Sequence, residues 1–194
     1  MKGKINMLRK PPSSALRNRT KTTHPETLLE VLDASGKPLL LMPQQAVARQ
    51  GLQHRAVLVC LKDRSDKIFV HKRPAGAALY PAMWDISACG HLVAGESHHD
   101  AAIRLLKEQL GIDSMDFFAP HGVQDAFPGP GNALFRLFIT ARTSAIPKPD
   151  TGEIHDGMFV DQEELEALER EFPEQITPFL RLAIPRLFGN REEA

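Results

Sequence analysis

The residues whose types and spacing could support metal binding or catalysis lie between Gly90 and Ile112. Two carboxylates, Glu96 and Glu108, stand on either side of Arg104 along this segment. Carboxylate oxygens suit Mg²⁺, which one or two of them hold together with waters and substrate phosphates. Arg104 and Glu108 also have the four-residue spacing of an ion pair on a helix surface. The spacing therefore leaves two interpretations open: a weak, substrate-assisted metal site, or a solvated ion pair.

The segment resembles the Nudix box, a loop–helix–loop motif that reads Gly, five residues, Glu, seven residues, Arg-Glu-apolar-x-Glu-Glu-x-Gly-apolar. Seven positions match that pattern, namely Gly90, Glu96, Arg104, Leu106, Glu108, Gly111 and Ile112. The resemblance extends over roughly residues 27–188. It implies an α/β fold, the Nudix-type α/β/α sandwich with a mixed sheet and the box as its loop–helix–loop.

The match fails at two of the three helical glutamates, where Leu105 and Gln109 stand instead. Glutamates at these positions would converge with Glu108 on one face of the helix. The resemblance implies a site for Mg²⁺ or Mn²⁺ that activates water and bridges a substrate diphosphate. The expected metal ligands are the Gly90 carbonyl, Glu96, Glu108 and, from outside the box, Glu153.

By resemblance, we expect a metal-dependent hydrolase of a nucleoside or other organic diphosphate. Glu108 and Arg104 are the expected catalytic residues, with Arg104 orienting Glu108, and catalysis is impaired if nothing replaces the missing glutamates. Four side chains near the box are expected to contact the substrate: Arg55, Lys72, Arg73 and His91. The alternative is a Nudix module that binds a diphosphate ligand or a protein without turnover.

A second resemblance within the same superfamily is to isopentenyl-diphosphate isomerase. The run from Trp84 to His91 contains a Cys-Gly-His that resembles the isomerase active site, which makes Cys89 a candidate proton donor or acceptor. His54 and His91 match two of that enzyme's metal-binding histidines. Other expected ligands are missing, because the third histidine and the glutamate pair fall on Val47 or Ala48 and on about Asn132 and Leu134. The isomerase is kept as a second alternative.

These residues need a helix and a sheet to position them. Apolar residues recur every three to four positions after Ser97, and Gly111 is a C-cap candidate, so a helix is predicted between them. A hairpin is predicted over residues 27–42 around Gly36. Runs 55–62 and 67–72 are predicted to pair across residues 63–66, followed by a short strand at 84–87.

The second half of the chain continues with alternating strands and helices. Strands are predicted at 133–141, after a Pro/Gly loop, and at 157–160. Asp161 is expected to open a helix, and a last helix is expected over roughly 174–188, interrupted by Pro178 and Pro185. We therefore expect one Nudix domain over residues 24–190.

Composition narrows the class of protein. The 194 residues carry 24 basic and 24 acidic side chains. Seven of the basic ones and no acid lie in residues 1–23, so we expect a basic tail on an acidic body. We predict a cytoplasmic protein that binds a small diphosphate compound and neither nucleic acid nor membrane. Two cysteines give no disulfide framework, and a homodimer is left open.

Overall fold

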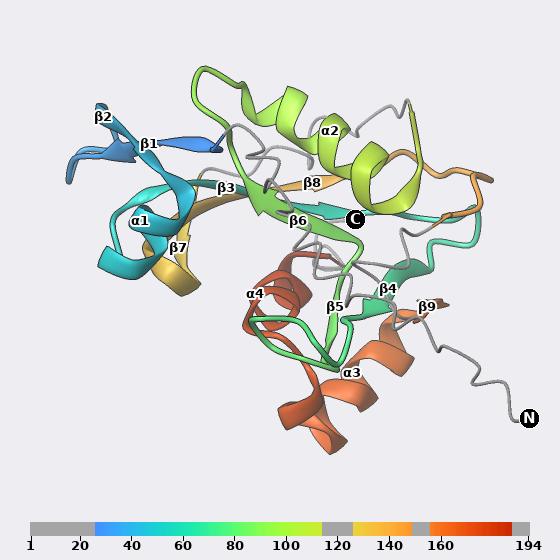
Figure 1. Cartoon of the computed structure of the whole chain (residues 1–194). Coiled ribbons are helices and arrows are strands. Elements are labelled where there is room, and N and C mark those ends of the chain that lie inside the picture. The colour runs from blue at the N-terminus through green and yellow to red at the C-terminus, as the bar shows by residue number, and fades with distance from the viewer. Residues whose placement is uncertain (1–25, 114–125, 149–155, 188–194) are drawn as a thin grey trace, which may run out of the picture.

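The computed structural model describes residues 26–113, 126–148 and 156–187 (Figure 1). The expected tail of residues 1–23 and the expected ligand Glu153 lie outside these ranges. Three sheets are described: one pairs β1 (Leu28–Leu32) with β2 (Pro38–Pro43), and the central one has the order β6-β3-β8-β7. The third sheet has the order β5-β4-β9.

The central sheet is mixed. Its strands are β3 (His54–Cys60), β6 (Ala88–His91), β7 (Phe127–Gly129) and β8 (Ala133–Ile139). β3 runs parallel to β8 and antiparallel to β6, and β7 runs antiparallel to β8. The strands of the third sheet are β4 (Ile68–Lys72), β5 (Trp84–Ile86) and β9 (Asp156–Val160), all antiparallel.

Helices cover both faces of the central sheet (Figure 1). α2 (His98–Leu110) lies on one face, and α3 (Gln162–Glu171) and α4 (Pro178–Leu187) lie on the other. Residues of β3 alternate between two apolar cores: Val57 and Val59 pack with the α2 side, and Ala56 and Leu58 pack with the α3 and α4 side. This period of two shows that β3 is buried on both faces, as the middle layer of an α/β/α sandwich must be. The predicted fold class is confirmed.

Several predicted elements are confirmed with their local causes. Asp33 accepts the Ser35 and Lys37 backbone N–H groups within the turn of the first hairpin, where Gly36 has a φ of 78°. Asp161 and Glu164 form a reciprocal capping box at the start of α3. Each device satisfies backbone N–H groups that would otherwise be unpaired.

The predicted pairing of runs 55–62 and 67–72 is wrong apart from one bridge, Lys62 to Ile68. Both edges of β3 are already taken by β6 and β8, so β4 continues into the third sheet. The final helix is also shorter than expected. Residues 173–175 form a short 3₁₀-helix, η2 (Pro173–Gln175), and Ile176 forms a β-bridge with Trp84, so α4 begins only at Pro178. A second 3₁₀-helix, η1 (Pro130–Asn132), lies between β7 and β8.

Pro178 therefore starts a helix, in the first turn where proline is tolerated, while Pro185 lies inside α4. One further helix, α1 (Gln44–Gln50), and the short strands β6 and β7 were not predicted. Within the described ranges, no helix is long and apolar enough to cross a bilayer.

Candidate active site beside helix α2

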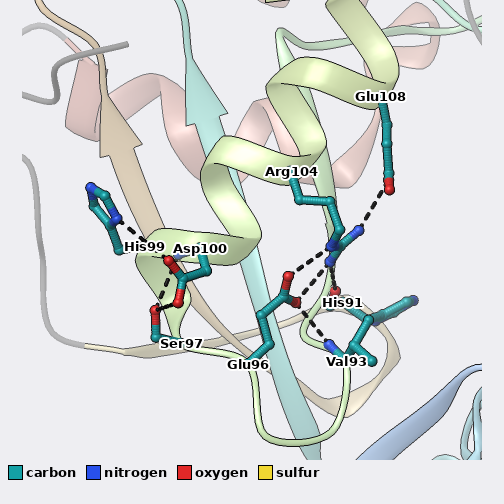
Figure 2. Close-up of polar contacts among 8 residues, drawn as sticks. All are labelled: His91, Val93, Glu96, Ser97, His99, Asp100, Arg104 and Glu108. Carbon is teal, nitrogen blue, oxygen red and sulfur yellow. Dashed lines mark hydrogen bonds and ion pairs between the residues drawn. The ribbon is translucent and has the colours of Figure 1, made fainter. Parts of the chain in front are cut away.

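Helix α2 begins and ends where the sequence predicts. The Ser97 hydroxyl accepts a hydrogen bond from the Asp100 backbone N–H at 3.1 Å, which satisfies one donor of the first turn. Gly111 has the left-handed conformation and ends the helix. The buried face, formed by Ala101, Ala102, Leu105, Leu106 and Leu110, packs toward the central sheet. Arg104 and Glu108 are left at the side of the helix that faces β6 (Figure 2).

The Arg104 guanidinium connects the loop, the helix and the strand (Figure 2). Its Nε and Nη2 donate to the two carboxylate oxygens of Glu96 at 2.7 and 2.9 Å. Nη2 also donates to the His91 carbonyl at 3.0 Å, and Nη1 donates to Glu108 at 3.1 Å. Four hydrogen bonds to two carboxylates and one carbonyl therefore fix the orientation of this side chain, and the bidentate pair is a strong one.

Glu96 and Glu108 sit in different environments. The Glu96 side chain is 14% exposed, and its Oε2 also accepts the Val93 backbone N–H at 3.0 Å. Burial opposes its ionisation, but hydrogen bonds from Arg104 and Val93 outweigh this and lower the pKa of Glu96. The Glu108 side chain is 55% exposed, and among the described residues its carboxylate is bonded only to Arg104. Glu108 is therefore the box carboxylate available to a ligand.

Leu105 occupies the place of the first missing glutamate as a core residue. Its side chain is buried and belongs to the apolar cluster of the α2 face. It also lies against Gly90, where an added Cβ would be 2.6 Å from Leu105 Cδ2. The absence of a side chain at Gly90 therefore allows the helix to approach β6 closely.

Gln109 completes the open edge of β6. Its Nε2 donates to the Cys89 carbonyl at 2.9 Å, and its Oε1 accepts the Cys89 backbone N–H at 3.2 Å. β6 is the last strand of its sheet, so these peptide groups have no strand partner on that side. The Gln109 amide pairs with the Cys89 peptide as a neighbouring strand would, and both its oxygen and its NH₂ group are hydrogen-bonded.

These contacts decide how well the box fits a resident divalent ion. Peptide groups alternate along an antiparallel ladder, so Cys89 and His91 point to the open edge and Gly90 points toward Val57. The two outward carbonyls are bonded to Gln109 and Arg104. Within the described ranges, no three His, Cys, Asp or Glu side chains gather in a way that could hold a metal ion. The described residues alone do not fit a resident ion.

A second polar cluster surrounds Asp85, which is fully buried. Its Oδ2 accepts from Arg73 Nη1 at 2.9 Å, and its Oδ1 accepts from the Thr177 hydroxyl at 2.7 Å. The Cys89 Sγ lies 3.9 Å from the same Oδ2. Asp85 and Thr177 were not predicted as site residues, although an acid inside a short apolar strand was a visible signal. The cluster ties β5 to the start of α4.

His54 and His91 lie side by side. Their Nε2 and Nδ1 atoms are 2.9 Å apart, and the other His54 nitrogen lies 2.8 Å from the Leu52 carbonyl. Burial lowers the pKa of His91 to about 4, and the neighbouring His54 adds to this effect. Burial also lowers the pKa of His54. Both imidazoles are therefore neutral at pH 7.

The expected substrate-binding cations are not gathered around Glu108. Arg55 is paired with Glu30 at 2.8 Å and Lys72 lies over the Trp84 ring, while Arg73 is bound to Asp85. Arg55 and Arg73 each have a carboxylate partner already. Arg55 meets the box through its backbone, where its carbonyl accepts the Leu92 N–H at 3.1 Å. His91 meets the box through its carbonyl rather than its imidazole.

The chain belongs to the Nudix domain family, which it matches over residues 52–182. Within that family it falls in the isopentenyl-diphosphate isomerase-like branch. An uncharacterized Nudix hydrolase of Pseudomonas aeruginosa is 31% identical over 136 residues, 70% of this chain and 79% of that protein. An isopentenyl-diphosphate Delta-isomerase of Cereibacter sphaeroides is 31% identical over 160 residues, 77% of this chain and 90% of that protein.

Solved structures agree on the fold. A Deinococcus radiodurans protein superposes with a TM-score of 0.69 at 18% identity, covering 83% of this chain and 99% of that one. A MutT protein from Methanosarcina mazei gives a TM-score of 0.55 at 18% identity, covering 70% and 92%. At this identity the likeness concerns the fold alone.

Replacing Gln109 with glutamate should destabilise the protein although it restores the Nudix pattern. A carboxylate cannot donate to the Cys89 carbonyl, so one hydrogen bond becomes a repulsive contact. We expect the free energy of unfolding to fall by about 1–3 kcal/mol in urea titrations. Gln45→Glu, on the exposed side of α1, is the matched control and should change it by less than about 0.5 kcal/mol. Equal effects of the two changes would contradict a stabilising role for the two hydrogen bonds between Gln109 and Cys89.

Acidification should destabilise the fold through the histidine pair. The pKa of histidine in the unfolded chain is about 6.5, whereas that of folded His91 is about 4. Between these two pH values, His91 is protonated in the unfolded chain but neutral in the folded protein, so acid favours unfolding. The contribution of neutral His91 to the free energy of unfolding is fully present above about pH 6.5 and is lost as the pH falls from there to about 4. We expect a melting temperature that drops from about pH 7 to 5, and a shallower drop in His91→Asn than in His99→Asn, an exposed control. Identical slopes in both variants would assign the loss to other groups.

Proposed function

We propose that the protein is a Nudix-type hydrolase whose substrate is the divalent-metal complex of a small organic diphosphate. The observation that carries this is the Arg104 network, which holds Glu108 exposed beside β6 while saturating Glu96. Family membership and the hydrolase-named relative support an enzyme of this class. One carboxylate together with substrate phosphates is a common way to bind Mg²⁺.

In the proposed reaction, water attacks one phosphorus atom and the bridging P–O bond breaks, which gives two phosphate products. Mg²⁺ or Mn²⁺ carried by the diphosphate would neutralise the phosphoryl oxygens and lower the pKa of bound water. Glu108 would position the complex, and Arg104 would hold Glu108 in place. Glu96 fixes Arg104 through the bidentate contact and so acts as a positioning residue. Glu153 is kept as a proposed additional ligand from outside the described residues.

Glu108→Gln tests this assignment, because it keeps the shape and removes the charge. We expect Mn²⁺-dependent phosphate release from a panel of nucleoside and other organic diphosphates, reduced by about 10²-fold or more in Glu108→Gln. Glu163→Gln, an exposed acid at the start of α3, is the matched control and should retain wild-type turnover. No turnover of any panel member at saturating Mn²⁺ would instead favour a diphosphate-binding module.

A second candidate, the isomerase, is favoured by two specific observations. The Cys89 thiol lies 3.9 Å from the buried Asp85 carboxylate, so a proton donor and a proton acceptor are adjacent. The 2.9 Å between the His54 and His91 nitrogens is also close to the separation of adjacent ligands on an octahedral ion, about 3 Å at bond lengths of about 2.1 Å. Isomerisation moves one double bond with one proton added and one removed, and releases no phosphate.

The two functions are separated by incubation with isopentenyl diphosphate and analysis of both products. The hydrolase predicts phosphate release that Cys89→Ala leaves intact and Glu108→Gln abolishes. The isomerase predicts an allylic diphosphate, no phosphate release, and loss of turnover in Cys89→Ala. Allylic product from the wild-type protein would therefore contradict the primary proposal.

A further inference from the structure

The loop between β6 and α2 is bonded through all of its first five peptide N–H groups, those of residues 92–96. Two of these bonds stay within the loop: the Val93 N–H donates to the Glu96 carboxylate at 3.0 Å, and the Glu96 N–H donates to the Val93 carbonyl at 2.9 Å. A third reaches β3, where the Arg55 carbonyl accepts the Leu92 N–H. The remaining two reach β1. The position of this loop therefore depends on the acceptors that its neighbours supply.

Strand β1 lies beside this loop and supplies both of those acceptors (Figure 1). The Ala94 N–H donates to the Leu28 carbonyl at 2.9 Å. The Gly95 N–H donates to Glu30 Oε1 at 3.4 Å. One contact is made by the backbone of β1 and the other by a side chain, so only the second can be removed by substitution. The first hairpin thus supports the part of the box that carries Glu96.

Gly95 lies where the loop turns. The bond from the Glu96 N–H to the Val93 carbonyl closes a four-residue turn, and Gly95 is the third residue of that turn, with a φ of 78°. A left-handed residue at the third position is typical of a type II turn, and glycine adopts it without strain. The carboxylate of Glu30 therefore contacts the loop within its turn, at the residue that precedes Glu96.

Glu30 is itself held in place by Arg55. Its Oε2 accepts from Arg55 Nη1 at 2.8 Å, and Arg55 Nη2 donates to the Gly36 carbonyl in the hairpin turn at 3.0 Å. The side chains of Glu30 and Arg55 are 25% and 28% exposed. The two oxygens of Glu30 thus have different donors, Arg55 for Oε2 and the box loop for Oε1. The arginine that was expected to contact the substrate instead orients a carboxylate that supports the loop.

We propose that Glu30 is a positioning residue for the box. It holds the Gly95 peptide next to Glu96. The Glu96 carboxylate orients Arg104, and Arg104 holds Glu108 (Figure 2). At 3.4 Å the bond to Gly95 is long, so its strength comes from the negative charge of the acceptor. The effect of Glu30 on turnover rests on the proposed function, whereas its effect on the loop does not.

NMR of the full chain without metal or diphosphate tests the contact with the loop. Glu30→Gln keeps the shape but leaves one oxygen for two donors, and Glu30→Ala removes both acceptors. In Glu30→Ala we expect amide hydrogen exchange at Gly95 to become about threefold faster or more, together with a shift of the Arg104 Nε–H resonance. Glu26→Gln, which changes an exposed acid two residues before β1 begins, is the matched control and should leave both signals unchanged.

Turnover of the diphosphate panel tests the link from Glu30 to Glu108. At a temperature well below the melting temperature of each variant, we expect kcat of Glu30→Gln to fall by about threefold to tenfold, with a smaller change in KM. Glu26→Gln should keep the wild-type kcat. A role confined to stability would lower the melting temperature and leave kcat unchanged. If Glu30→Ala fails to fold, Glu30→Gln is used for the NMR measurement as well.

The proposal is overturned by either of two results: Gly95 exchange and the Arg104 resonance that do not respond to the change at Glu30, or a kcat that falls no more in Glu30→Gln than in Glu26→Gln. If the wild-type protein turns over no diphosphate, the proposed function fails, and the two NMR signals decide whether Glu30 positions the loop. If wild-type turnover depends on Glu108 but not on Glu30, the hydrolase stands and this proposal fails.

Discussion

The guanidinium of Arg104 is the interaction on which the rest of the site depends. It bonds the loop after β6 through Glu96, the strand itself through the His91 carbonyl, and the helix through Glu108. The Glu96 carboxylate is nearly buried, so without Arg104 only the Val93 N–H would offset the cost of burying its charge. The same contacts leave Glu108 as the exposed acid. We therefore propose that Glu96 has the structural role and Glu108 the chemical one.

Two departures from the Nudix pattern turn a ligand-bearing helix face into a packing face. Leu105 fills the space above Gly90, and Gln109 closes the edge of β6. Restoring glutamates at both positions would bury a charge in the apolar cluster and break an amide pair, so the family pattern cannot simply be written back. A ligand that brings its own cation is the chemistry that such a face can still serve.

Local features of the fold could be predicted from the sequence because neighbouring residues determine them. Ser97 and Gly111 bound α2, and Asp161 with Glu164 starts α3, through contacts within one helical turn. The partners of β3 could not be predicted, because strand pairing depends on which distant segments reach its edges. The wrong pairing of runs 55–62 and 67–72 came from this difference.

In the candidate site too, contacts within one helix could be predicted and contacts between distant segments could not. The spacing of Arg104 and Glu108 indicated their contact, since both lie on one helix. The saturation of Glu96 and Gln109 could not be anticipated, because it depends on how closely α2 approaches β6. Asp85 and Thr177 are 92 residues apart along the chain and meet only through the docking of α4 on β5.

We propose that the divalent ion arrives with the diphosphate rather than residing in the protein. The most direct measurement is an EPR titration of free Mn²⁺ with the full chain, in the presence and absence of methylenediphosphonate. We expect little loss of the free Mn²⁺ signal with protein alone, and a loss beyond that caused by the diphosphonate when both are present. Tight Mn²⁺ binding by the protein alone, or no additional binding with the diphosphonate, would contradict it.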